Sequence, residues 1–278
     1  MPGGDRRAGA RLRALESHSL LRRELMVGAG FCLLAAAAVA AADEGSAASA
    51  AGGPTTTPAA RRAVDPRAVS RVRTGLPLVA LTFDDGPDPD FTPHVLDVLA
   101  RFGARATFFA VGRNAAAHPG LVARALHEGH VVANHTRDHL WLDQVSRTRV
   151  ESEVRDGGAD LARLGVPGHG LFRPPRGWTS PTVAEVTERA GLRSIFWSDC
   201  IEAHARQGVR TAAAGIVGRA HHGSIILAHD GGLVTGPNPQ RIDRSRTVET
   251  LPHVLAGLAR RGLKPVTLPQ LLRAGEPA

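Results

Sequence analysis

Two adjacent carboxylates follow an apolar run in the first third of the chain. The stretch LVALTFDDGPDPD, residues 78–90, passes directly from that run to Asp84 and Asp85 and then to a Gly-Pro turn. Like charges at the end of a buried strand repel each other unless a cation lies beside them. Farther along, His135 and His139 are spaced so that their imidazoles, one helical turn apart, can face one divalent ion. The pattern indicates a metal site.

The same four side chains could carry out hydrolysis. Two imidazoles and one carboxylate make three protein ligands and leave open positions for water and substrate. Such an ion lowers the pKa of water toward about 7, and the second carboxylate, ionised beside the cation, can accept the proton. Residue types alone do not say which aspartate has which task. Taken singly, Asp-Asp-Gly is typical of a turn and each histidine of a core or rim position, so the inference depends on the set.

Short apolar runs alternate with helical segments from about Leu76 onward. Seven strands are predicted, at 78–83, 106–111, 130–133, 171–173, 193–198, 224–228 and 265–268. Helices between them are marked by proline at the start and glycine after the end. This alternation predicts parallel βα units in an α/β barrel, with an open doubly wound sheet as the alternative.

Polar residues follow five of these strands. They are Asp84-Asp85 after the first strand, NHTRDH (134–139) after the third, RPPRG (173–177) after the fourth, SDCIEAH (198–204) after the fifth and AHDG (228–231) after the sixth. In α/β folds the carboxyl ends of parallel strands meet at one rim, where reactive groups gather. We therefore expect one site there.

Four of these motifs resemble, in this order, those of the polysaccharide deacetylases, the NodB-homology domain of carbohydrate esterase family four. They are TFDDGP (82–87), HTRDH (135–139), RPPRG (173–177) and LAHD (227–230). The resemblance covers about residues 78–272. It implies a distorted (β/α) barrel, which agrees with the seven parallel strands counted independently.

The resemblance also implies a task for each residue. Asp84 would be the general base, oriented by Arg173, and His229 the general acid. The implied ligands of a divalent ion, expected to be zinc, are Asp85, His135 and His139. The backbone N–H of Arg176 would hold the oxyanion, with Pro175 and Leu227 beside it at the substrate, and Thr136 would brace the metal loop.

Two positions depart from the family pattern. The family usually has an aromatic residue where Arg176 stands, so the main-chain donor is kept while the pocket wall becomes cationic. At the fifth strand end the family's Asp-x-x-Asp-Trp is not clearly present, and His204 stands near the usual tryptophan. Asp199 or Glu202 could hold a protonated His229, or both could be solvated rim residues; Asp199 is favoured by its proximity to the strand.

The N-terminus is predicted to be a targeting segment. Residues 1–42 contain a basic region closed by Arg22-Arg23 and an uncharged stretch from 25 to 42, typical of a signal peptide or, less favoured, a membrane anchor. An Ala/Pro/Thr-rich disordered linker is expected at 43–75 and the catalytic domain at 76–273. We expect the protein to be secreted or anchored on the outer face of the cytoplasmic membrane, with membrane contact only through this segment.

Charge and cysteine content exclude other classes. The formal net charge is +8, but the arginines of the chain are spread along the sequence and form no basic block, which argues against nucleic-acid binding. The two cysteines, Cys32 and Cys200, imply no disulfide framework.

We therefore expect a metal-dependent hydrolase that removes N-acetyl groups from amino sugars of a cell-wall or chitin-like glycan, either peptidoglycan or chitooligosaccharide. The alternatives are an acetylxylan-type O-deacetylase, a deformylase or deacetylase of a lipid-linked sugar, and a catalytically inactive glycan-binding barrel. The sequence does not predict the oligomeric state.

Overall fold

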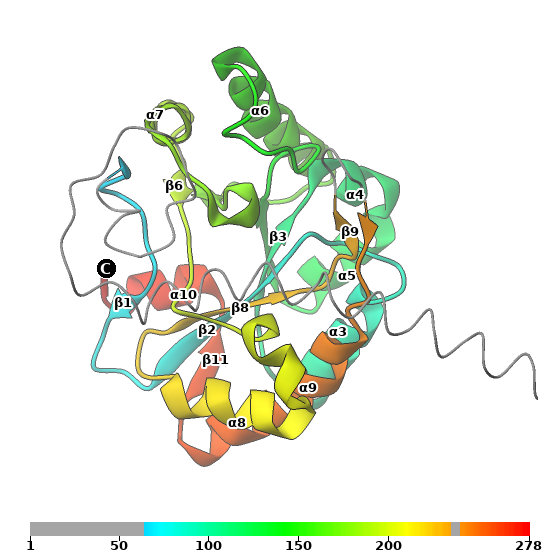
Figure 1. Cartoon of the computed structure of the whole chain (residues 1–278), viewed down its shortest axis with the longest axis vertical. Helices are drawn as coiled ribbons and strands as arrows, with labels where there is room; N and C mark the ends of the chain where they lie inside the picture. Colours follow the sequence, from blue (N-terminus) through cyan, green and yellow to red (C-terminus); the bar gives the residue numbers. More distant parts are fainter. Residues whose placement is uncertain (1–63, 235–239) are drawn as a thin grey trace, which may run out of the picture.

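The strand that ends in the two aspartates lies in the middle of a curled parallel sheet with helices around it (Figure 1). The computed structural model describes residues 64–234 and 240–278. In these ranges the sheet has eight strands in the order β6-β5-β4-β3-β2-β8-β7, with β11 paired to the start of β2. They are β2 (Leu78–Asp84), β3 (Thr107–Ala110), β4 (Val131–Asn134), β5 (Leu171–Phe172), β6 (Arg193–Ser194), β7 (Asp199–Cys200), β8 (Ile225–His229) and β11 (Lys264–Val266). The seven predicted strands and the α/β barrel are confirmed.

The sheet curls because one stretch of chain, residues 193–200, pairs first with one strand of the sheet and then with another. Residues of β6 pair with β5, whereas β7, a few residues later, pairs with β8. Between them the Ser198 backbone N–H donates to Ile225 O at 2.8 Å. The chain from 193 to 200 therefore links the two edges of the sheet, which excludes the open doubly wound alternative.

Alternation along β2 explains why a buried strand can carry a carboxylate. Val79, Leu81 and Phe83 pack in the large apolar core, which includes residues of the surrounding helices, whereas Ala80 belongs to a second cluster. Successive side chains of a strand point to opposite faces. Asp84 therefore lies on the face of Ala80, away from the helix-side core.

The helices around the sheet include three that have the proline start and the glycine end that the sequence indicated. The helices are α3 (Thr92–Arg101), α4 (Gly112–Ala117), α5 (Pro119–His127), α6 (Arg147–Arg163), α7 (Pro181–Arg189), α8 (Val209–Arg219), α9 (Ser245–Arg260) and α10 (Leu268–Arg273), with 3-10 turns at Pro175–Gly177 and Glu202–Gln207. The Ser180 side chain caps α7 by accepting from Val183 N, and Pro181 opens that helix. After α3, α5 and α7, the residues Gly103, Gly129 and Gly191 adopt positive φ, which glycine tolerates.

Both ends of the domain extend beyond the predicted boundaries. Residues 64–75, assigned to the linker from their composition, pack on the barrel instead, with Val69 and Val72 buried. The Val72 backbone N–H donates to Gly223 O, and β1 (Val72–Arg73) pairs with β12 (Glu276–Pro277), so the domain reaches residue 278. A further short pair is β9 (Leu233–Val234) with β10 (Gln240–Arg241). The few apolar residues here were outweighed by Arg, Ala and Pro in the sequence pattern.

The predicted targeting segment at 1–42 lies outside the described residues and stays a prediction. Across 64–234 and 240–278, no helix is long and apolar enough to cross a membrane.

Candidate active site

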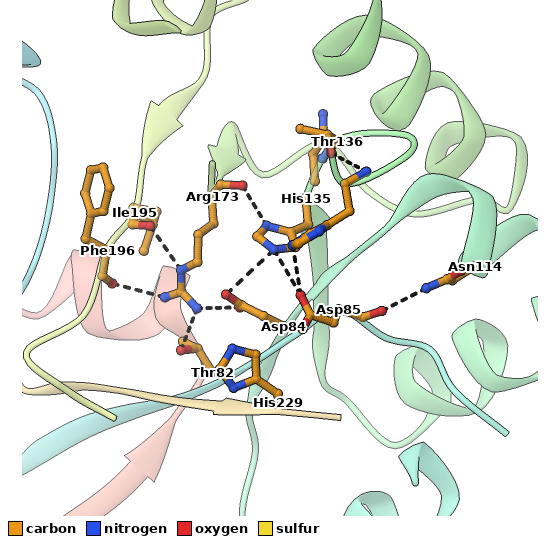
Figure 2. A network of polar contacts seen from close by, with 12 residues as sticks. Thr82, Asp84, Asp85, Asn114, His135, Thr136, Arg173, Ile195, Phe196 and His229 are labelled. Carbon is orange, nitrogen blue, oxygen red and sulfur yellow. Dashed lines mark hydrogen bonds and ion pairs between the residues drawn. The ribbon is translucent and has the colours of Figure 1, made fainter. Parts of the chain in front are cut away.

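Asp84 is held by a fully buried arginine. Strand register places Asp84 beside His229 on the neighbouring β8. The Arg173 guanidinium donates to Asp84 Oδ1 at 2.6 Å and to Thr82 Oγ1 at 2.9 Å, and its other nitrogens donate to the carbonyls of Ile195 and Phe196 (Figure 2). Burial lowers the pKa of Arg173, and the negative charge of Asp84 opposes that shift. The carboxylate is thus fixed in direction and paired with a cation, as expected from the sequence.

The next residue turns away from the strand toward the two histidines. Asp85 has a φ of 74°, and its Oδ1 lies 3.5 Å from His135 Nε2 and 3.2 Å from His139 Nε2. One ligand atom from each of the three residues lies within 4.8 Å of the others, and all three are buried. The structure therefore brings together the three residues expected to bind the metal, of which Asp85 and His135 are labelled in Figure 2.

The chemistry of this donor set fits a divalent cation. His135 Nδ1 lies 2.7 Å from Arg173 O, and because a carbonyl only accepts, Nδ1 carries the proton and Nε2 presents a lone pair to the site. Burial would raise the pKa of Asp85, but when the histidines are protonated the charge of His139 and the hydrogen bonds from His135 and His139 outweigh burial and hold that pKa well below its usual range. An ionised carboxylate and imidazole nitrogens facing one point make a cation site.

The histidines lie on a loop and not on a helix. Two hydrogen bonds fold this loop so that the two histidines, four positions apart in the sequence, face the same point. Asn134 Oδ1 accepts from Thr136 N, and Thr136 Oγ1 accepts from His139 N. Thr136 and His139 have φ values of 68° and 55°. Non-glycine residues in the left-handed region cost on the order of 1–3 kcal/mol each and persist where surrounding contacts determine them. Thr136 braces this loop, as predicted.

Helix α6 supports the loop through a glycine. A Cβ on Gly157 would lie 2.5 Å from the carbonyl carbon of Thr136 and 2.7 Å from Asn134 Oδ1. We expect Gly157→Ala to lower the free energy of unfolding by about 1–3 kcal/mol and to weaken metal binding, because the helix must move away from the loop.

Gly158→Ala is the matched control for this substitution. Its Cβ would meet only Asn134 Nδ2, at 3.5 Å, and alanine favours a helix over glycine by roughly 0.5–1 kcal/mol. Denaturant unfolding and metal titration of both variants would check this; equal effects at 157 and 158 would contradict it.

Glu202, and not Asp199, is the partner of His229. His229 Nδ1 lies 3.1 Å from Glu202 Oε2, and the His229 backbone N–H donates to Glu202 Oε1 at 3.0 Å. Thr247 Oγ1 donates to the same oxygen at 2.6 Å. Asp199 pairs with Arg219 at 2.6 Å, so the preference for Asp199 was wrong. Proximity to the strand misled because the 3-10 turn after β7 returns Glu202 to the rim.

Glu202 and His229 shift each other's pKa, and the two shifts have opposite directions. Burial and the charge of Arg244 would lower the pKa of His229, but Glu202 outweighs them and raises it to about 9. Burial would raise the pKa of Glu202, but the charge of His229 and its hydrogen bond lower it. His229 is therefore protonated at neutral pH.

Arg176, whose side chain was expected to make the pocket wall cationic, stacks on two tryptophan rings. It has a φ of 61° in the turn Pro175–Gly177, of which Pro175 is buried. Its guanidinium carbon lies 3.6 Å from the ring centre of Trp141 and 3.9 Å from that of Trp178. Such cation–π contacts stabilise a partly desolvated charge. Leu227, the other expected substrate contact, is buried on β8, while the side chain of His204 lies outside the described part of the chain.

Sequence reasoning missed Arg244. Its Nη2 donates to Asp85 Oδ2 at 3.0 Å from the residue that precedes α9. No sequence pattern marks it, because its significance depends on burial: a cation beside a helix N-terminus opposes the helix dipole, so a buried one there needs a specific partner.

A parallel barrel with an Asp-His-His cation site at its carboxyl rim, beside a second aspartate and a protonated histidine, belongs to the metal-dependent hydrolases. The family model described as polysaccharide deacetylase matches residues 71–195. The chain is 38% identical over 198 residues to a peptidoglycan-N-acetylglucosamine deacetylase of Bacillus cereus, covering 70% of this chain and 88% of that protein. It is 38% identical over 207 residues to a chitooligosaccharide deacetylase of Sinorhizobium fredii, covering 73% and 96%. The chain therefore belongs to the polysaccharide deacetylase family.

Solved structures of deacetylases and esterases have a similar fold. A peptidoglycan N-acetylglucosamine deacetylase in complex with 4-naphthalen-1-yl-N-oxidanyl-benzamide aligns with a TM-score of 0.66 at 29% identity, over 76% of this chain and 95% of that one. A family 4 carbohydrate esterase from Streptomyces lividans in complex with acetate aligns with a TM-score of 0.61 at 30% identity, over 72% and 95%.

Proposed function

We propose that the protein is a metal-dependent deacetylase that hydrolyses the N-acetyl groups of amino sugars in peptidoglycan or chitooligosaccharides. The observation that carries the proposal is the buried Asp85–His135–His139 set beside the separately held Asp84 and His229. The relatives named for both glycans support the substrate class. Peptidoglycan lies outside the cytoplasmic membrane, which fits the targeting segment expected at 1–42.

The residues divide the reaction between them. Asp85, His135 and His139 would hold a divalent ion, which we propose is zinc because the set has two nitrogen ligands and one oxygen ligand; such an ion would act as a Lewis acid toward water and the acetyl carbonyl. Asp84, oriented by Arg173, accepts the proton of the attacking water. His229, kept protonated by Glu202, donates a proton to the departing amine. The main-chain N–H of Arg176 would donate to the oxyanion.

Acetate release by the purified protein tests this function. We expect zinc-loaded protein to release acetate from N-acetylated chitooligosaccharides or peptidoglycan, to stop when a chelator is added, and to recover when zinc is returned. Elemental analysis should find about one ion per chain, and His139→Ala should lose it.

Further arms of this assay separate the alternatives. Release only from acetylated xylan would favour the O-deacetylase, and release only from a lipid-linked sugar would favour that substrate. Bound metal without release from any substrate would contradict catalysis and favour a glycan-binding barrel.

A further inference from the structure

The two oxygens of the Asp85 carboxylate have different partners. Oδ1 faces His135 Nε2 and His139 Nε2, whereas Oδ2 accepts from Arg244 Nη2 at 3.0 Å. The Asp85 main chain is fixed as well, because Asn114 Nδ2 donates to Asp85 O at 2.8 Å (Figure 2). Rotation of this carboxylate would break the contact with Arg244.

Arg244 is itself held in one position. Its Nε donates to Gly231 O at 2.8 Å, and the residue is 6% exposed. Gly231 follows β8 by two residues, and a Cβ there would lie 2.2 Å from the Asp85 carbonyl. The guanidinium is thus fixed between the chain after β8 and the carboxylate after β2.

A buried cation here needs a reason. The start of α9 carries the positive end of the helix dipole, and the guanidinium adds a charge close to a cation site. A neutral side chain would avoid both repulsions, and an apolar one would fill the same volume. The directional bonds to Asp85 Oδ2 and Gly231 O are favourable contributions that only a donor at this position supplies, and the first of them acts on the metal site.

We propose that Arg244 is a positioning residue of the metal centre, which holds Oδ2 of Asp85 so that Oδ1 is the oxygen presented to the ion. The inference rests on the metal site of the proposed function. It goes beyond that function by assigning a residue outside the four motifs to the site. Residues that orient metal ligands typically change metal affinity by ~10–100-fold when they are replaced.

Zinc affinity of the full chain, measured in competition with a chromophoric chelator, tests the proposal. Arg244→Met keeps the length of the side chain but removes the donor, and we expect it to weaken zinc binding by ~10–100-fold. Arg244→Lys should restore part of that loss, because an ammonium can still donate to Oδ2 but cannot also reach Gly231 O. Unchanged or tighter zinc binding by Arg244→Met would overturn the proposal.

Arg241→Met is the matched control. Arg241 pairs with Asp88 Oδ2 at 3.1 Å and with Asp90, and within the described part of the chain no hydrogen bond or ion pair joins it to Asp85, His135 or His139, so zinc affinity should not change. Thermal unfolding of the metal-free variants separates positioning from general loosening. If zinc affinity follows the unfolding temperature across all variants, and not the presence of a donor at position 244, the role is structural and the proposal fails. Failure of the wild-type protein to bind zinc would overturn both this inference and the proposed function.

Discussion

Replacing Asp84 with asparagine is expected to lower turnover by ~10²–10⁴-fold, the loss typical of removing a general base. The amide keeps the size of the side chain, and its oxygen can still accept from Arg173. It cannot take a proton from water. Because the cation site is formed by Asp85 and the two histidines, we expect zinc to remain bound at the wild-type level. Initial rates of acetate release and zinc content, measured on the same preparation, check both statements.

Asp85→Asn is the control, because the two aspartates are chemical equivalents with different surroundings. Here the charged oxygen that faces His135 and His139 is replaced by a neutral, poorer ligand. Zinc binding should weaken, and part of the lost activity should return when excess zinc is added. No activity should return for Asp84→Asn. If Asp84→Asn is the variant that loses zinc and recovers, the two tasks must be exchanged.

Alternation and strand ends were enough to predict the barrel and its rim. The closeness of Asp84 and His229 could be predicted in this way, because the parallel register brings the carboxyl ends of β2 and β8 together. The two histidines and one carboxylate of the aspartate pair were predicted as a metal site from their types and spacing, and the family resemblance singled out Asp85. The histidines are brought together by a loop with two left-handed residues and not by a helix.

What sequence could not supply were contacts between segments far apart in the chain. Arg244 meets Asp85 across 159 positions, and Thr247 reaches Glu202 across 45. No local period encodes such pairs. Likewise, the choice between Asp199 and Glu202 depends on a short turn whose direction is set by packing, and the chain before β2 is ordered by Val69 and Val72 in a stretch whose composition is typical of a linker.

Glu202→Gln should move the alkaline limit of activity to lower pH. The general acid must be protonated, and Glu202 raises the pKa of His229 to about 9 against the opposing effects of burial and Arg244. With a neutral glutamine, burial and Arg244 remain and outweigh the smaller raising effect of Asp85, so the pKa of His229 should fall below its ordinary value near 6.5. At pH 8 most of the acid form would then be lost. A bound divalent ion repels the imidazolium in both proteins, so the shift between their pH–rate profiles is the quantity to measure.

The same pair predicts how unfolding depends on pH. Because the pKa of His229 is raised, this residue stabilises the fold fully below about pH 6.5, and its contribution is lost above about pH 9. The lowered pKa of Glu202 stabilises it above about 4.5, and this contribution is lost as the pH falls through its folded-state value. The unfolding free energy of wild type and Glu202→Gln should therefore differ most between about pH 4.5 and 6.5.

Asp199→Asn is the control that decides which carboxylate acts on His229. Asp199 pairs with a half-exposed Arg219, and exposed pairs contribute at most about 1 kcal/mol. The alkaline limit of its pH–rate profile should therefore not move, because Asp199 does not contact His229. A shifted alkaline limit in Asp199→Asn together with an unchanged one in Glu202→Gln would restore the assignment favoured by sequence proximity. The reverse result would mean that the carboxylate on the turn after β7, brought to the rim by packing, sets the protonation of His229.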